Sequence, residues 1–326
     1  MYRVKKQYSQ TKFALGGDVT LTLVTDQNQG DVDELIRKLW LSIYLFEKQF
    51  SRFIPSSELS TFNRSAGIKQ QISPEFKYIL ETAKNLSQQT GGLFNPFILP
   101  ALQRAGYKKS MAKGYENDPV EDYSRHKVVD AKLLKIGDNW AEIPYGTAID
   151  LGGCGKGYLA DLLADTMVPD WVQGYWFSIG GDVAGQGYDQ KGQPWIIEVD
   201  QGDTSSKYRI HTSGERWAAA TSGTTIRQGT KNGKNWHHII DPLTLQPSQT
   251  DLRMASVYTN RTVTADVLAS CAIILGSNKA QVFLKEQAVK GFVLRGEIND
   301  KQILRKFGQD IKRKESDKLD KVVQHA

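Results

Sequence analysis

The glycine-rich stretch DLGGCGKGYLAD, residues 150–161, limits what this chain can fold into more than any other feature. Its glycines allow backbone angles and close approaches that a β-carbon would forbid, and helical apolar spacing follows over residues 158–167. The pattern therefore predicts a helix whose N-terminus opens at the glycines. Free amide groups, the helix dipole and Lys156 would favour an anion there, while Asp150 could accept hydrogen bonds from a hydroxyl or ring nitrogen. A plain glycine turn with a surface lysine explains the same residues, and the spacing matches neither a P-loop nor a dinucleotide-binding turn.

Length and composition indicate an ordinary globular protein. A chain of 326 residues, 40% hydrophobic and 24% charged, can bury a sizeable core. The net charge of +6 fits solubility as well as an anionic partner, and without an arginine-rich aromatic platform we expect no nucleic-acid binding. Two cysteines, Cys154 and Cys271, do not indicate a disulfide framework.

The N-terminal residues MYRVKKQYSQTKFALGG lack the apolar core of a signal peptide and a lipid-accepting cysteine. No window reaches the length of a membrane span. We therefore expect a chain without a transmembrane segment, cytoplasmic as given, or periplasmic if an export signal has been removed.

The order of elements predicts an α+β fold, because strands come in runs instead of alternating with helices. We expect a strand at 18–25, helices at 31–50 and 73–89, a loop at 51–63, strands at 140–149, 175–179, 195–199, 208–212, 217–221 and 255–259, helices at 264–275 and 279–287, and a last strand at 292–294. Residues 108–125 indicate an exposed insertion, and 309–326 a charged tail, solvated or a frayed helix.

Two further segments carry polar groups. In FSIGGDVAGQG, residues 177–187, a strand runs into a β-turn. In AAATSGTTIR, followed by HHIIDP, the hydroxyls of Thr221 and Ser222 could meet phosphate oxygens, and His238 could act as a base near neutral pH. A buried strand end with a structural histidine explains the second segment equally.

The segment TADVLASCAIILG places Asp266 and Ser270 four residues apart, hence on one side of a helix. A carboxylate and a hydroxyl are hard ligands suited to Mg²⁺, which takes few protein ligands. Helix capping is the alternative, with Thr264 as the N-cap and Asp266 in the first turn.

In this order the segments resemble the ApbE family of flavin transferases, FAD:protein FMN transferases. The resemblance covers most of the chain and rests on FALGG, SRFIPSSELSTFN, SPEFKYILETAKNLSQQTGGLFNP, AIDLGGCGKGYLAD, FSIGGDVAGQG, AATSG, HHIIDP and TADVLASCAIILG. It implies an ApbE-like, T-fold-like architecture of mixed strands and helices in two intimately joined lobes, with residues 1–308 as the flavin transferase domain.

The resemblance also implies a reaction. Enzymes of this family bind FAD and Mg²⁺ and move FMN onto a threonine or serine hydroxyl of a target flavoprotein, with release of AMP. Two alternatives remain open: a Mg²⁺-dependent pyrophosphatase that splits FAD into FMN and AMP, and a non-catalytic FAD-binding protein.

Site residues follow from the resemblance position by position. The metal would be held by the carbonyl of Gly153 and the side chains of Asp266 and Ser270, and His238 is the candidate base for the acceptor hydroxyl. FAD would be contacted by Leu15, Phe53, Leu93, Phe94, Asn95, Asp150, Lys156 and Ile240.

The chain departs from the family pattern at four of these positions. Asn95 stands where the family usually has aspartate, which exchanges a carboxylate for an amide. Leu15 replaces the usual methionine, Phe53 lacks an aromatic hydroxyl, and Ser270 replaces threonine but keeps the hydroxyl. These changes bear on nucleotide affinity more than on the chemistry.

Overall fold

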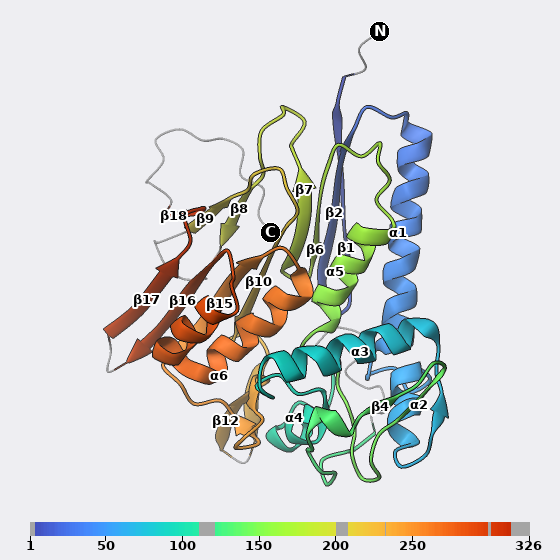
Figure 1. The fold of residues 1–326 in the computed structure, drawn as a ribbon, viewed down its shortest axis with the longest axis vertical. Helices are drawn as coiled ribbons and strands as arrows, with labels where there is room; N and C mark the ends of the chain where they lie inside the picture. The colour runs from blue at the N-terminus through green and yellow to red at the C-terminus, as the bar shows by residue number, and fades with distance from the viewer. Residues whose placement is uncertain (1–3, 111–120, 200–207, 232, 299–300, 314–326) are drawn as a thin grey trace.

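The computed structural model describes residues 4–110, 121–199, 208–231, 233–298 and 301–313. Its centre is an antiparallel sheet of eight strands in the order β1-β2-β6-β7-β10-β15-β16-β17 (Figure 1). These strands span Lys6–Ala14 (β1), Gly17–Thr25 (β2), Gly174–Ile179 (β6), Asp182–Gly187 (β7), Trp217–Gly223 (β10), Leu252–Thr259 (β15), Gly291–Ile298 (β16) and Lys301–Phe307 (β17). With helices on one face and a small sheet on the other, the predicted α+β class is confirmed.

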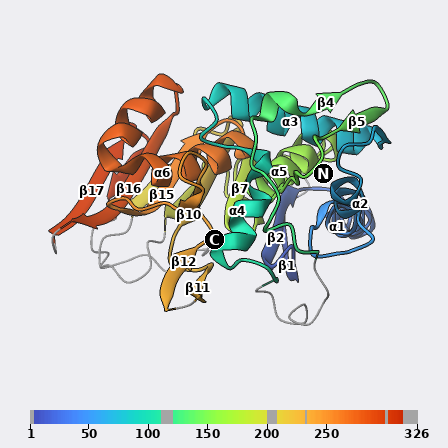
Figure 2. The ribbon, with the colours of Figure 1, turned by 90° about the horizontal axis from the view of Figure 1, so that it is seen from below.

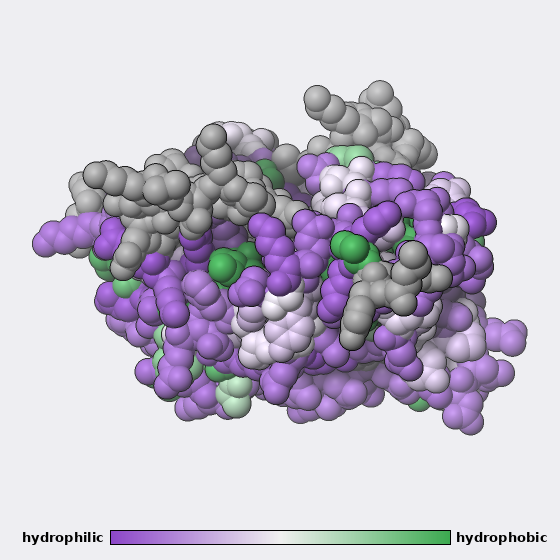
Figure 3. Space-filling view, turned by 90° about the horizontal axis from the view of Figure 1, so that it is seen from above, coloured by the Kyte–Doolittle hydropathy of each residue, from purple (hydrophilic) through white to green (hydrophobic). Residues whose placement is uncertain are grey.

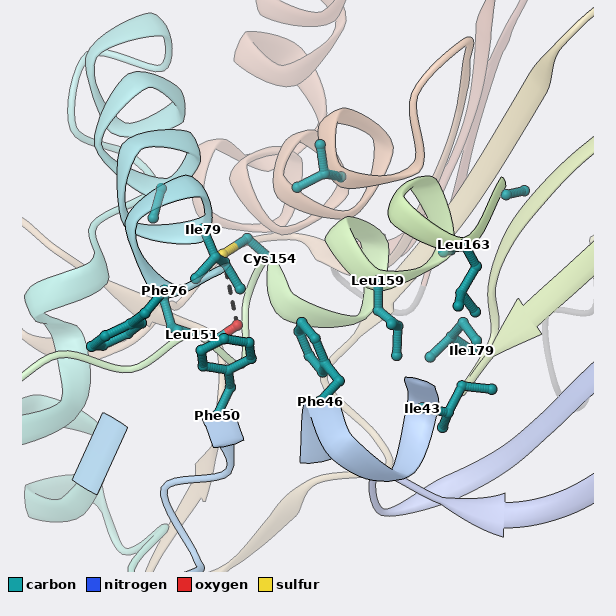
Figure 4. Packing of buried hydrophobic residues seen from close by; sticks show 14 of the residues in the cluster. Ile43, Phe46, Phe50, Phe76, Ile79, Leu151, Cys154, Leu159, Leu163 and Ile179 are labelled. Atoms are coloured by element: carbon teal, nitrogen blue, oxygen red, sulfur yellow. Dashed lines mark hydrogen bonds between the residues drawn. The ribbon is translucent and has the colours of Figure 1, made fainter. Parts of the chain in front are cut away.

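The helical layer consists of α1 (Gln29–Phe50), α5 (Gly155–Thr166) and α6 (Thr262–Glu286), as Figure 2 shows from below. Helix α5 contacts β6 and β7, and α6 contacts β10 and β15. Apolar residues at helical spacing explain this layer, since Leu35, Leu39 and Ile43 of α1 are buried on one face. In Figure 4, Ile43 and Phe46 of α1 lie against Leu159 of α5, with Ile179 of β6 beside Leu163.

A second lobe of short elements lies beyond one end of the sheet (Figure 1). It contains α2 (Glu58–Arg64), β3 (Gln70–Gln71), α3 (Pro74–Gln89), η1 (Pro96–Ile98), α4 (Leu99–Ala105), η2 (Ala131–Leu133), β4 (Lys135–Ile136) and β5 (Trp140–Glu142). Two short hairpins, β11 (Gln228–Lys231) with β12 (Lys234–His237) and β13 (Ile240–Asp241) with β14 (Gln246–Pro247), complete the fold. Phe76 and Ile79 of α3 share one hydrophobic cluster with Leu159 of α5, so the lobes are intimately joined.

The opposite face of the large sheet is covered by β8 (Ile196–Val199), β9 (Tyr208–His211) and β18 (Ile311–Arg313). Between the two sheets lie three tryptophans, Trp176, Trp195 and Trp217. Strand β18 pairs with β9, so the ordered fold extends past residue 308 into the segment expected to be a tail. Residues 314–326 of that segment lie outside the described residues.

Several predicted elements match the structure closely. The strand at 18–25 and the helix at 31–50 correspond to β2 and α1. Helix α3 begins after Ser73, whose hydroxyl accepts a hydrogen bond from the Phe76 amide at 3.1 Å. The strands predicted within 175–179, 195–199, 208–212, 217–221, 255–259 and 292–294 correspond to β6, β8, β9, β10, β15 and β16.

Two predicted elements differ from the structure. The loop at 51–63 contains helix α2, capped by the Ser57 hydroxyl, and the strand at 140–149 ends at Glu142. The two late helices are confirmed as two helical segments joined within α6 at Gly276, where a φ of 75° interrupts the helical backbone. The insertion at 108–125 lies partly outside the described residues; at its described end Glu121 and Asp122 are exposed and Tyr123 is buried.

Helix α6 is apolar over much of its length. Helix α6 is long and apolar enough to cross a membrane, yet 56% of its most apolar window is buried, and it packs on β10 and β15 as a core helix. In Figure 3 the coloured residues are mostly hydrophilic, and hydrophobic ones stand in small separate groups. Scattered apolar residues of this kind are normal on protein surfaces.

The N-terminus of α6 is held by a side chain of α5. Arg261, at the cap position, makes no side-chain cap. Instead the buried carboxylate of Asp161 accepts hydrogen bonds from the amides of Thr262 at 2.9 Å and Val263 at 3.0 Å. Helix α6 therefore begins before Thr264, and the proposed Thr264 cap is wrong. One turn earlier in α5, a β-carbon on Gly157 would lie 2.7 Å from the Thr262 carbonyl oxygen, so only glycine allows this approach.

We predict that Asp161→Ala destabilises the protein by roughly 3–5 kcal/mol, because it uncaps α6 and leaves the Arg216 guanidinium, 2.9 Å from Asp161, without that partner. Urea denaturation measures the loss. The control is Asp165→Ala one turn along α5: its carboxylate is 39% exposed and pairs with Arg261, so the cost should stay within about 1 kcal/mol. Equal losses in the two variants would show that the cap contributes nothing.

Candidate active site

A cavity of about 860 Å³ opens between the two lobes. Its wall is built by the β1–β2 turn, the C-terminal end of α1, the glycine turn before α5, the β6–β7 turn, β10, the HHIIDP segment and α6. All twelve residues predicted for a metal or nucleotide site line it: Leu15, Phe53, Leu93, Phe94, Asn95, Asp150, Gly153, Lys156, His238, Ile240, Asp266 and Ser270. The fold thus gathers residues from both lobes around one space of ligand size.

The glycine turn is shaped by close contacts. The Gly152 amide donates to the Asp150 carboxylate at 3.0 Å, and a β-carbon on Gly152 would lie 2.8 Å from the same oxygen. A β-carbon on Gly153 would lie 3.3 Å from the Phe94 ring. The turn is therefore tight, and α5 starts directly after it at Gly155 with its amide end toward the cavity.

Cys154, inside the same turn, is a packing residue. Its thiol is completely buried and lies 3.7 Å from the Leu151 carbonyl oxygen, the dashed contact of Figure 4. Burial raises the pKa of the Cys154 thiol well above its ordinary value. Because the thiolate is the reactive form, this cysteine is not a nucleophile.

Asp150 is held by an arginine that the sequence did not single out. The Nε of Arg52 lies 2.9 Å from the Asp150 carboxylate, and both side chains are largely buried. The guanidinium carbon sits 4.1 Å from the ring centroid of Phe53 and 4.7 Å from that of Tyr107. These contacts with two aromatic rings fix Arg52, which in turn fixes the carboxylate.

Lys156 is likewise paired, with Asp182 of the β6–β7 turn. Burial acts to lower the pKa of Lys156, but the carboxylates of Asp182 and Asp266 outweigh it and raise the pKa. Burial, followed by the charge of Asp182, raises the pKa of Asp266 to about 8. Lys156 therefore pairs with Asp182, and its positive charge also acts on Asp266.

The groups around Asp266 fit a hard cation. Its Oδ2 is buried without a hydrogen-bond partner, and four residues along α6 the Ser270 hydroxyl lies 2.8 Å from that of Ser222. Within the described residues there is no cluster of three or more histidine, cysteine or acidic side chains that could hold a metal. A cation here would have few protein ligands and would complete its shell with water or substrate oxygens, as Mg²⁺ does.

Two adjacent histidines have different surroundings. His237 is structural, because its Nε2 lies 3.0 Å from the Ser248 carbonyl oxygen and its Nδ1 accepts from the Ile239 amide at 3.3 Å. His238 lines the cavity, and its Nδ1 is buried without a partner. Burial, aided by the charge of Arg227, lowers the pKa of His238 to about 3, so the imidazole is neutral at neutral pH.

Asn95 stands where the family usually has aspartate, and both the nitrogen and the oxygen of its side-chain amide form hydrogen bonds within the protein. Its Nδ2 donates to the Val129 carbonyl at 2.9 Å, and its Oδ1 accepts from the Phe97 amide at 3.0 Å as the cap of η1. An ionised aspartate could keep only the second of these bonds. The amide is therefore explained by the local backbone of this chain.

The family model described as "ApbE family" matches residues 15–293. A Haemophilus influenzae protein named FAD:protein FMN transferase is 24% identical over 272 residues, which covers 81% of this chain and 77% of that protein. A Klebsiella pneumoniae protein with the same name is 28% identical and covers 86% of each chain.

Solved structures share the fold. The apo crystal structure of the Pseudomonas stutzeri flavinyl transferase ApbE aligns with a TM-score of 0.79 at 21% identity and covers 94% of this chain and 96% of that one. The flavin transferase ApbE from Vibrio cholerae aligns with a TM-score of 0.76 at 21% identity and covers 94% and 98%. The ApbE-like architecture expected from the sequence is confirmed.

We predict that Asn95→Asp destabilises the protein by about 1–3 kcal/mol at pH 7, because a carboxylate would face the Val129 carbonyl without a hydrogen to donate. The matched control is Asn139→Asp at an exposed position, which should change stability by less than about 0.5 kcal/mol. The deficit at position 95 should shrink toward pH 4, where a protonated carboxyl regains a donor. Urea denaturation at both pH values measures it, and a deficit that is absent at pH 7 would contradict the assignment.

Proposed function

The chain belongs to the ApbE family, and on that basis we propose that it is a Mg²⁺-dependent FAD:protein FMN transferase. It would move FMN from FAD onto a threonine or serine hydroxyl of a target flavoprotein and release AMP. The observation that carries this proposal is the convergence of all twelve predicted site residues on one cavity. They come from six separate parts of the sequence, and their gathering around one cavity supports the proposal.

The cavity offers surfaces for both halves of a flavin dinucleotide. Aromatic side chains line part of the wall, among them Phe53, Phe94 and Tyr107, and can pack against planar rings. Polar and charged groups gather around Asp150, Lys156 and Asp266. This division of apolar wall and polar centre suits a ligand with ring systems at its ends and a diphosphate between them.

The reaction forms one bond and breaks another. The acceptor hydroxyl oxygen bonds to the phosphorus of the FMN half, while the bond from that phosphorus to the bridging oxygen breaks and its electron pair leaves with AMP. His238 would receive the hydroxyl proton: its neutral imidazole lines the cavity, and its buried Nδ1 has no hydrogen-bond partner among the described residues. The negative charge of a bound diphosphate would raise the low pKa of His238 and so make it a better base.

The carbonyl of Gly153, the carboxylate of Asp266 and the hydroxyl of Ser270 would hold Mg²⁺. When bound, the cation neutralises diphosphate charge. The surrounding side chains would prepare these ligands. The charges of Lys156 and Asp182 act on Asp266 in opposite directions, and the Ser222 hydroxyl orients the Ser270 hydroxyl through a hydrogen bond.

We expect that the purified protein, given FAD, Mg²⁺ and an acceptor with an Asp-x-x-Ser/Thr-Gly-Ala-Ser/Thr stretch, releases AMP and makes the acceptor fluorescent in a denaturing gel. An acceptor with alanine at the hydroxyl position is the control and should stay dark. Free FMN and AMP without labelled acceptor would establish the pyrophosphatase instead. FAD binding without any AMP would establish a binding protein.

We also predict that Asp266→Ala lowers Mg²⁺-dependent AMP release by at least about 100-fold, since it removes the carboxylate of the cation site. Asp266→Asn should act similarly while keeping the melting temperature near that of the unmodified chain, because it changes a buried Oδ2 that has no hydrogen-bond partner among the described residues. Asp138→Asn, on a fully exposed side chain, is the control and should retain full activity. Unchanged turnover in Asp266→Ala would contradict the proposed cation site.

A further inference from the structure

Arg227 lies directly beside the candidate base. It precedes β11, and its carbonyl oxygen accepts a hydrogen bond from the His238 amide at 3.0 Å. The next pair along the hairpin is Gln228 with His237, so Arg227 and His238 lie opposite each other at the base of the hairpin. Side chains at opposed positions of an antiparallel pair lie on the same face, and both of these line the cavity.

Among the cations that line the cavity, Arg227 differs in having no carboxylate partner within the described residues. Arg52 is paired with Asp150, and Lys156 with Asp182. Arg227 forms no salt bridge with any described acidic group, although it is half-buried in the cavity wall. Its guanidinium is therefore the cationic group of this wall that remains available to an anionic ligand.

The hydroxyls beside Arg227 are already engaged with one another. The Thr221 hydroxyl lies 2.8 Å from that of Ser256, and the Ser222 hydroxyl 2.8 Å from that of Ser270. Each has fewer hydrogen-bonding positions left for a phosphate than the sequence suggested. A five-donor guanidinium in the same stretch is better equipped to hold phosphate oxygens.

A diphosphate close to Asp266 needs positive charge nearby. Asp266 and Asp182 are both buried acidic groups, and Lys156 already offsets them. The field of Arg227 reaches this centre, because its charge acts on both His238 and Asp266. Arg227 is thus close to the groups that would surround the bond being broken.

We propose that Arg227 is a substrate-binding residue that donates guanidinium hydrogens to the phosphate oxygens flanking the bond that is broken. This rests on the proposed function for the identity of the diphosphate. Negative charge builds on the AMP phosphate as its bond to the FMN phosphorus breaks, and a planar guanidinium can meet two oxygens at once. Burial keeps the imidazole of His238 neutral, and the positive charge of Arg227 adds to this effect.

The test measures binding of phosphorylated and unphosphorylated ligands to the full-length chain. We compare ADP with adenosine and FMN with riboflavin by titration calorimetry in the unmodified protein, Arg227→Met and Arg227→Lys. Arg227→Met should weaken ADP, FMN or both at least 10-fold and leave adenosine and riboflavin unchanged. Arg227→Lys keeps the charge without the fork and should fall between the two.

The pattern of losses assigns the contact. A loss confined to ADP places Arg227 on the AMP phosphate, a loss confined to FMN places it on the FMN phosphate, and losses in both place it across the bridge. Equal weakening of adenosine and riboflavin would overturn the proposal in favour of a structural role, as would unchanged affinity for both phosphorylated ligands. Lys231→Met, on the same hairpin with the same charge change, is the control and should bind every ligand as the unmodified chain does.

These binding measurements are independent of turnover. If the unmodified chain neither releases AMP nor labels an acceptor, the proposed function fails, while the phosphate-dependent loss at Arg227 can still be seen. If turnover is present and Arg227→Met binds every ligand normally, the inference about Arg227 fails alone. Thermal unfolding of each variant verifies that the folded protein is being compared.

Discussion

The site depends on the carboxylate of Asp161, which joins α5 to the N-terminus of α6. The glycine turn leads into α5, whereas Asp266 and Ser270 lie on the first turns of α6. With α6 fixed at its first amides and brought close by Gly157, the two halves of the site have one relative position. A single buried side chain therefore sets the distance between groups more than 100 residues apart in the sequence.

Local signals explain which elements could be predicted. A serine cap followed by proline predicts helix α3, and an apolar run predicts β2. Strand β1 gives no such signal, because none of its residues is buried and its sequence KQYSQTKFA is largely polar. It becomes a strand by pairing along the whole length of β2, and β17 likewise follows β16. Pairing with a neighbour is a tertiary effect that composition does not reveal.

The same distinction separates the predicted site residues from those that were missed. Short motifs contain the twelve predicted residues, but the partners that hold them come from elsewhere: Asp182 is 26 residues from Lys156, and Val129 is 34 from Asn95. Arg52 adjoins a predicted contact residue, yet nothing in SRFIP signals a buried ion pair. Arg227 stood within a segment already singled out, and only the hairpin pairing showed that it faces His238. Motifs in the sequence thus predict which residues line the cavity, whereas the ion pairs and hydrogen bonds that hold those residues can be identified only from the fold.

The pairing of the small hairpin β11–β12 decides which of two adjacent histidines faces the cavity. Gln228 pairs with His237, so Arg227 and His238 lie opposite each other, and both line the cavity. A slip of one residue in this pairing would turn every side chain over and present His237 to the cavity in place of His238. The register of a short hairpin is therefore as necessary to the site as the histidine itself.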